Sequence, residues 1–162
     1  MRHVLSVLVE NEPGVLSRVS GLFSGRGFNV ESLNVASTLD PEISRMTITT
    51  VGDDFIVEQI IKQLRKLVTV IKVVDLTSLS AVEREMLMIK VSADDSHRDE
   101  VMRIVDIFRC KVVDVSPADI TIEATGTYEK LQAMLSLLAK FGVRDMARTG
   151  VVAMRRSMQP QV

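Results

Sequence analysis

The sequence is poor in cysteine, in aromatic residues and in any excess of charge. Its 162 residues include one cysteine, Cys110, so no disulfide can form within the chain, and this usage is typical of a reducing compartment such as the cytoplasm. Lysine and arginine number 20 against 21 aspartate and glutamate residues, which leaves none of the basic excess that binds nucleic acid or anionic membranes. No apolar run approaches the length of a transmembrane helix. We therefore expect a cytoplasmic protein without a nucleic-acid partner or a membrane.

A recognisable catalytic or metal-binding set is also missing. The two histidines, His3 and His97, have no cysteine or second histidine at the spacing of a metal site. The acidic pairs Asp53–Asp54 and Asp94–Asp95 stand just before predicted helices, where solvated carboxylates complement the positive end of the helix dipole. The glycines between Gly21 and Gly27 fall at the end of a predicted helix, whereas a dinucleotide-binding loop places them between a strand and a helix start. The chain is therefore not expected to be an enzyme on its own, or to hold a metal or cofactor.

What the sequence does contain is a hydrophobic pattern that changes between the period of strands and that of helices, in an order that occurs twice. In the first round, strands are predicted at Arg2–Glu10, Asn29–Thr38, Ser44–Val51 and Val70–Leu76. Helices are predicted at Gly14–Arg26 and in a segment that begins at Gly52. In the second round, strands are predicted at Glu85–Ala93, Lys111–Val115, Ile120–Thr125 and within Val143–Met154. Helices are predicted around Val101–Phe108 and Leu131–Leu138. Each round is a βαββαβ unit. We expect an α+β fold of two tandem ferredoxin-like domains, residues 1–77 and 84–162, with a linker over residues 78–83.

The same order of elements also occurs in RNA-recognition modules, which stack bases on aromatic side chains of their strands. Here the predicted strands contain none of the five phenylalanines or the single tyrosine. RNA binding is therefore disfavoured, and a small ligand is the better expectation.

A turn at residues 11–16 is the best candidate for binding such a ligand. It follows the first predicted strand and leads directly into a helix, so backbone N–H groups and the positive end of the helix dipole converge on one point. Gly14 has no Cβ and lets a ligand approach the backbone. Asn11 can cap the helix or donate to the ligand. A small anion such as an amino-acid carboxylate would fit, although the same residues also suit an ordinary strand-to-helix turn with a capping asparagine.

The second predicted strand, Asn29–Thr38, suggests how the chain associates. A domain of about 80 residues buries only about 60% of its unfolded surface and is marginal alone. The ferredoxin-like strand order leaves this strand on a sheet edge. It contains no lysine, arginine or proline to protect the edge, whereas Leu33 and Val35 are apolar. We therefore expect a homodimer in which this strand pairs with its copy.

Several stretches resemble a known family. The run Leu5–Val19 is similar to the signature of the ACT domain, and in particular to that of the small regulatory subunit of acetolactate (acetohydroxyacid) synthase. Arg26–Leu33, Ser44–Ile48 and Ala147–Val152 resemble motifs of the same subfamily, and the likeness extends over almost the whole chain. The acidic loop Asp94–Asp99 matches less well, so no role is transferred to it.

The resemblance implies a non-catalytic regulatory subunit of a transferase. Its partner is a large catalytic subunit that holds thiamine diphosphate, Mg²⁺ and FAD and condenses pyruvate with pyruvate or 2-oxobutyrate. The small subunit raises the activity of the large one and makes it sensitive to feedback inhibition, commonly by valine. No cofactor is implied for this chain.

In the family, the effector lies between two ACT domains. The resemblance implies that backbone N–H groups at Gly14 and Val15 hold its carboxylate, with Asn11 orienting the loop or joining the polar contact. Asn29 of the second protomer accepts from its ammonium group, and Val15 and Val30 enclose its side chain. Structural roles for the same residues are the alternative: Asn29 ending a turn, and Val15 and Val30 lying in the core.

Two other functions stay open at this point. One is a free-standing tandem ACT sensor that regulates a different target, and the other is an enzyme, which the missing catalytic set disfavours. The residues alone do not distinguish valine from leucine or isoleucine, because one methylene in an apolar pocket is worth only ~1–3 kcal/mol.

Overall fold

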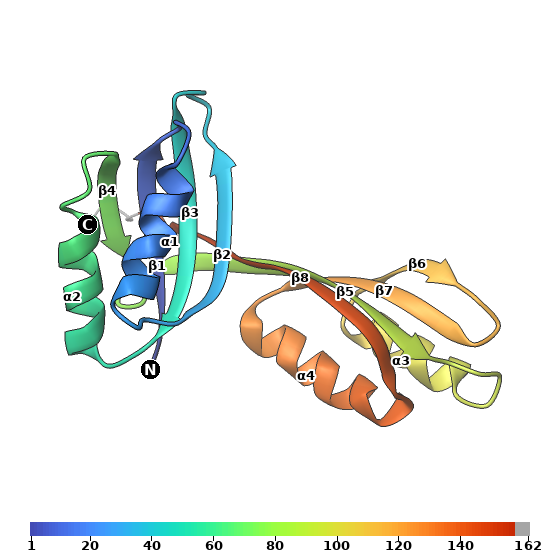
Figure 1. Cartoon of the computed structure of the whole chain (residues 1–162). Coiled ribbons are helices and arrows are strands. Elements are labelled where there is room, and N and C mark those ends of the chain that lie inside the picture. The colour runs from blue at the N-terminus through green and yellow to red at the C-terminus, as the bar shows by residue number, and fades with distance from the viewer. Residues whose placement is uncertain (158–162) are drawn as a thin grey trace, which may run out of the picture. The chain divides into compact units, whose positions relative to one another are not determined.

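The computed structural model of the chain describes residues 1–157. The predicted βαββαβ order occurs twice, which confirms the expected α+β fold with two ferredoxin-like sheets (Figure 1). The first round comprises β1 (Arg2–Glu10), α1 (Val15–Gly25), β2 (Val30–Ser37), β3 (Ile43–Val51), α2 (Asp54–Leu64) and β4 (Val70–Asp75). The second comprises β5 (Ala81–Ser92), α3 (Arg98–Ile107), β6 (Lys111–Val115), β7 (Asp119–Gly126), α4 (Tyr128–Leu138), a 3₁₀ turn (Ala139–Phe141) and β8 (Val143–Arg155).

The first sheet has the strand order β2-β3-β1-β4, so β2 is an edge strand as predicted. Along β1, alternate side chains point to opposite faces of the sheet. One face of the sheet is apolar and packs against the two helices of this round. The core between them contains buried side chains of β1, β3, α1, α2 and β4: Leu5, Val7, Val9, Met46, Ile48, Val15, Val19, Phe23, Val57, Ile60, Leu64 and Val73. This packing fixes the direction of α1 relative to the sheet.

The second sheet has the equivalent order, β6-β7-β5-β8. Its helices α3 and α4 cover one face over a separate core, formed by Leu87, Ile89, Val91, Ala93, Val101, Ile104, Val105, Ile120, Ile122, Ala124, Leu131, Met134 and Leu138. At the sheet end, Arg148 donates two hydrogen bonds to the buried carboxylate of Glu85, at 2.8 and 2.6 Å. The two rounds therefore fold around independent cores.

Helices α2 and α4 begin where the sequence places side-chain acceptors for their free N–H groups. Asp53 caps α2 by accepting from the Ile56 N–H at 2.8 Å. Gly27 follows the end of α1 with φ +68°, the left-handed conformation expected from its position after the helix. No helix among residues 1–157 combines the length and apolar character needed to cross a bilayer.

Packing divides the chain into two compact units, and one of them is formed by two separate segments of the sequence. One is Met1–Val82 together with the segment from Gly150 on, and the other is Glu83–Thr149. In the first unit, Val4 and Leu76 form a small buried cluster with Val151 and Ala153 of β8. The predicted limits of residues 1–77, 78–83 and 84–162 do not include this return of the chain, and they stay a prediction.

Gly150 offers a test of the close packing in the returning segment. Its φ is +79°, and an added Cβ would lie 2.9 Å from Ser32 Cβ of β2. We expect Gly150→Ala to lower the free energy of unfolding by about 2–4 kcal/mol, because left-handed strain and overpacking add. Gly21→Ala is the control, since Gly21 lies within α1 with no heavy atom within 4 Å of an added Cβ. It should stabilise the protein by about 0.5–1 kcal/mol. Urea denaturation measures both, and equal midpoints would contradict the prediction.

Candidate functional site

The turn between β1 and α1 is held by the neighbouring β2–β3 turn. The Asn11 N–H donates to the Glu42 carbonyl at 2.7 Å, and Asn11 Nδ2 donates to the Pro41 carbonyl at 2.9 Å. The Glu10 N–H donates to the Thr69 carbonyl at 2.9 Å. No side chain caps α1, so the suggestion that Asn11 caps this helix is wrong. Its side chain orients the loop instead.

Gly14 stands directly before the first residue of α1 and leaves the end of the helix open. Its backbone is left-handed, with φ +86° and ψ −5°, and an added Cβ would meet no heavy atom within 4 Å. The first N–H groups of a helix have no acceptor within the helix. Here no acidic residue lies in the first turn to neutralise the positive end of the dipole. The turn therefore presents uncapped donors to open space, which suits a small anion.

An ion pair beside the turn was not singled out from the sequence. Arg18 Nη1 donates to Glu12 Oε1 at 2.6 Å, which draws the Glu12 carboxylate onto the side of α1. Glu12 would otherwise bring a negative charge to the same end of the helix. The spacing of the two residues across a helix start is the only signal that the sequence carries for this pair.

In the single chain, the side chain of Val15 takes the structural role that was the alternative to contact with a ligand. Its side chain is only 6% exposed and packs into the core of the first unit. Its N–H reaches the Glu12 carbonyl at 3.4 Å, which is a long hydrogen bond. In the single chain, therefore, the backbone of Val15 faces the turn and its side chain does not.

Asn29 and Val30 lie at the start of β2. The Asn29 carbonyl accepts from Thr50 Oγ1 at 2.6 Å, and the residue is exposed. No hydrogen bond to its side-chain amide occurs among residues 1–157. Beside it, a pocket of about 250 Å³ opens between α1 and β2, lined mainly by apolar side chains: Val19, Phe23, Phe28, Val30, Leu33 and Ile48, with Ser20, Ser24 and Asn29. Val30 therefore packs partly on the core and also lines a cavity.

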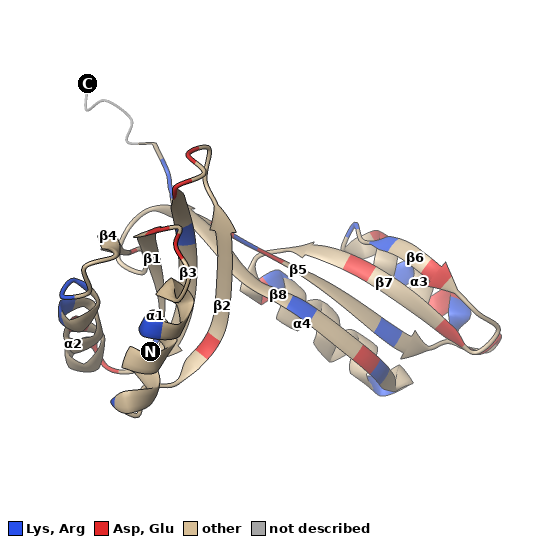
Figure 2. Cartoon of the chain, turned by 45° about the horizontal axis from the view of Figure 1, so that its top comes forward, with Lys and Arg blue, Asp and Glu red and all other residues tan. Residues whose placement is uncertain are grey.

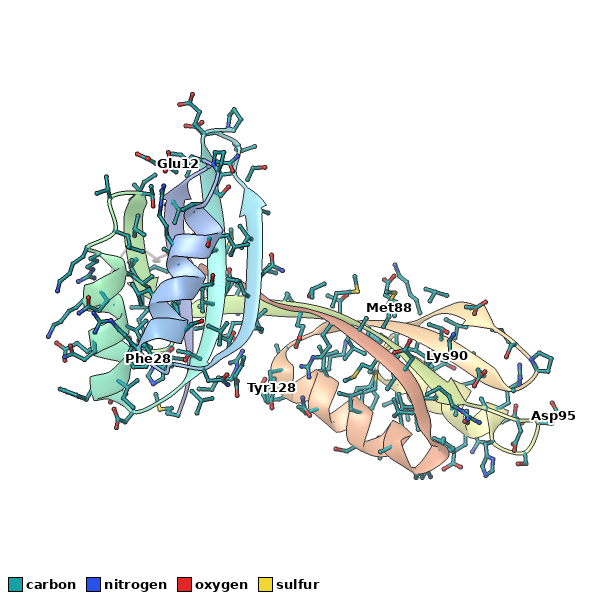
Figure 3. The ribbon with its side chains drawn as sticks, in the orientation of Figure 1. Glu12, Phe28, Met88, Lys90, Asp95 and Tyr128 are labelled. Carbon is teal, nitrogen blue, oxygen red and sulfur yellow. The ribbon has the colours of Figure 1, made fainter. Side chains whose placement is uncertain are left out.

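One chain does not bring the two halves of the predicted site together. Gly14 precedes α1 and Asn29 follows it, and the 11 residues of α1 span about 16 Å. Figure 3 shows this separation, with Glu12 beside one end of α1 and Phe28 beside the other. The carboxylate and ammonium groups of an α-amino acid are separated by only one carbon. No such molecule can contact Gly14 and Asn29 of the same chain at once.

Neither histidine adjoins the turn. His3 is buried, with Nε2 3.6 Å from Asp54 Oδ1 and Nδ1 3.5 Å from Asp75 Oδ2. His97 lies in the second unit, before α3. Burial raises the pKa of the Cys110 thiol, which disfavours the nucleophilic thiolate. Within the described part of the chain, no group of three or more His, Cys, Asp or Glu side chains is placed to hold a metal ion.

Comparisons with known proteins give the same result for both halves of the chain. A family model for the AHAS (acetohydroxyacid synthase) small subunit-like ACT domain matches residues 5–72, and one for the small subunit of acetolactate synthase matches residues 84–157. The chain is 54% identical over 158 residues to the acetolactate synthase small subunit of Aquifex aeolicus, covering 97% of this chain and 82% of that protein. It is 51% identical over 157 residues to the acetolactate synthase isozyme 3 small subunit of Salmonella typhimurium, covering 96% of each.

A solved structure supports the same relationship. The crystal structure of the acetolactate synthase small subunit from Thermotoga maritima matches with a TM-score of 0.88 and 44% sequence identity, over 98% of this chain and 99% of that one. The resemblance found in the sequence is thereby confirmed. The chain belongs to the acetolactate synthase small-subunit family.

Proposed function

We propose that this chain is the non-catalytic regulatory subunit of a cytoplasmic acetolactate synthase. It activates the large catalytic subunit and confers feedback inhibition by valine or a related branched-chain amino acid. The observation that carries the effector site is the uncapped start of α1, where the left-handed Gly14 leaves open space before free N–H groups. Thiamine diphosphate, Mg²⁺ and FAD are assigned to the large subunit.

Strand topology supports a site shared between two copies of the chain. Ser37 at the end of β2 pairs with Ser44, which also pairs with Val9 near the end of β1, so β2 ends beside the turn that contains Gly14. β2 is an edge strand, and Val35 on it is 39% exposed. In an antiparallel β2–β2 pair, the start of the second β2 lies beside the end of the first. Asn29 of the second copy then approaches Gly14 of the first.

The chemistry of the two halves matches the two ends of an amino acid. The α1 terminus attracts the carboxylate, and the exposed amide oxygen of Asn29 accepts a hydrogen bond from the ammonium group. In this proposal the apolar pocket beside Asn29 receives the side chain of the effector, and its lining favours a branched aliphatic side chain over a polar one. Each dimer would hold two such sites.

Regulation follows from linkage between this site and the contact with the large subunit. An effector changes that contact only if it binds the activating and inhibiting arrangements with different affinity. A site formed by two chains provides this difference, because closing it depends on how the chains pair. A free-standing sensor of another target is the second candidate, and the family match over both halves of the chain favours the subunit.

The edge that forms the dimer can be tested by adding one charge. Val35→Lys places a cation on the free edge of β2, which disfavours pairing with a second strand, so we expect a monomer. Ile71→Lys is the matched control, because Ile71 is 52% exposed on β4, the other edge of the same sheet. Light scattering at micromolar concentration should find a dimer for the wild type and the control. A dimeric Val35→Lys protein, or a monomeric wild type, would contradict the β2 interface.

Gly14→Asp should abolish feedback inhibition while the protein stays folded. The added side chain has space, and aspartate is among the residues that adopt left-handed backbone, but it brings a negative charge to the carboxylate position. A dissociation constant of about 0.1 mM corresponds to about −5.5 kcal/mol, so a loss of ~3 kcal/mol weakens binding more than a hundredfold.

The readout is the activity of synthase reconstituted with its large subunit in millimolar valine. Gly142→Asp is the control, because Gly142 also has a positive φ, +92°, but lies in the second unit. The control should stay inhibited and the Gly14 variant should stay active. Normal inhibition of the Gly14 variant would place the effector elsewhere.

Asn29 allows two arrangements to be distinguished. In a trans site, Asn29 contacts the turn of the partner chain, and in a cis site it contacts the turn of its own chain. Asn29→Ala removes a hydrogen bond to a charged group, worth ~1.5–3 kcal/mol, so effector affinity should fall at least tenfold. In a heterodimer of Asn29→Ala with Gly14→Asp, a shared site leaves one site intact and puts both lesions in the other. If Asn29 served the turn of its own chain, every site would carry one lesion.

Calorimetric titration of a purified, differently tagged heterodimer with valine counts the sites. We expect half of the wild-type number. Both homodimeric variants serve as controls and should bind weakly. A heterodimer with no restored site would refute the shared interface even if each single variant behaves as expected.

A further inference from the structure

A basic groove runs between the two helices of the first unit, on their flanks rather than at the α1 terminus. It has a volume of about 580 Å³, and we call it the α1–α2 groove: Arg18, Gly21, Leu22, Gly25, Arg26, Gln63, Lys66 and Leu67 line it. None of these residues has a part in the effector site proposed above, apart from the Arg18 contact with Glu12. The groove is therefore a second, unexplained feature of the unit.

Its charge is of one sign. α1 contains no aspartate or glutamate, and Figure 2 shows basic residues on α1 and near the end of α2. Arg18 pairs with Glu12, but Arg26 and Lys66 are exposed and have no ion-pair partner among residues 1–157. The whole chain has a net charge of −1, so this concentration of cations is local. An acidic surface is its complement.

Two glycines shape the groove, and packing within the chain does not explain them. Gly21 and Gly25 are one helical turn apart on α1, and an added Cβ at either would meet no heavy atom within 4 Å. Neither has the positive φ that requires glycine, and glycine destabilises a helix relative to alanine. Their absence of side chains lets the backbone of another helix come close, above the half-buried Leu22 and Leu67.

These observations favour a protein segment over a small phosphate compound as the ligand of the α1–α2 groove. Phosphates are held by converging backbone N–H groups at helix starts and glycine-rich loops. The α1–α2 groove is formed by helix flanks, whose N–H groups are used within the helices. Its cations are spread along a wide groove with an apolar floor, which matches the acidic and apolar faces of an amphipathic helix.

We propose that the α1–α2 groove docks an acidic amphipathic helix of a protein partner. This proposal rests on the proposed function, in which the partner is the catalytic large subunit. Arg26 and Lys66 contact its acidic face, while Gly21 and Gly25 admit its backbone. The effector site at the turn and the docking site would then share one helix, α1.

The test measures the affinity of the full-length chain for the purified large subunit by calorimetry. Arg26→Glu combined with Lys66→Glu should weaken binding at least about tenfold at low salt and reduce its salt dependence. Arg103→Glu combined with Lys111→Glu changes the net charge equally in the second unit and should bind as the wild type does. Gly21→Gln fills the groove with a good helix former, so it should bind at least about tenfold more weakly while unfolding at the wild-type temperature or above.

Three results would overturn the proposal. Wild-type affinity of both groove variants would refute the docking site alone, since the wild type would still bind the large subunit. A wild-type chain that does not bind the large subunit would refute the docking site and the proposed function together. Stoichiometric binding of inorganic tripolyphosphate that the charge reversal removes, with large-subunit affinity unchanged, would identify a small-anion site instead.

Discussion

The pairing register of β1 with β3 is the constraint on which the first unit depends. Leu5 lies opposite Ile48 and Val7 opposite Met46, so both strands turn their apolar side chains toward α1 and α2. Because side chains alternate along a strand, a shift of one residue would turn this whole set to the opposite face. The same register places Glu10 opposite Ile43, which brings the β2–β3 turn within reach of Asn11. The core and the orientation of the α1 terminus therefore have one common cause.

Much of this was predictable from the sequence, because the responsible forces are local. Alternation and helical periodicity record which side chains must be buried, and they predicted both βαββαβ rounds and the edge position of β2. Asn11 marks the limit of this reasoning, since its residue type favours a helix cap. Its amide instead reaches the carbonyl of Pro41, and only the three-dimensional position of the β2–β3 turn decides between the two bonds.

Several features that sequence reasoning missed depend on contacts between distant segments. Gly150 lies within the segment predicted to contain the last strand, and the pattern there does not indicate that it packs against Ser32 or that β8 returns to cover Val4. Val15 fits the helical stripe and the ligand-contacting role equally well in sequence, and packing puts its side chain in the core. The proposed combination of Gly14 with Asn29 came from the family resemblance, because the two residues lie at opposite ends of α1. A pattern in one chain does not indicate which residues two chains would bring together.

The return of β8 to the first unit has a consequence for how the protein is made. The last strand supplies Val151 and Ala153, so the first unit is discontinuous in sequence, whereas Glu83–Thr149 is a continuous segment. During synthesis, domains generally fold as their residues leave the ribosome, starting from the N-terminus. Here Val4 and Leu76 emerge early, but their contacts with Val151 and Ala153 form only after β8 has been made. The first unit is thus completed only after translation has passed the second unit, and a chain that stops before β8 leaves the apolar surface of Val4 and Leu76 that β8 packs against uncovered.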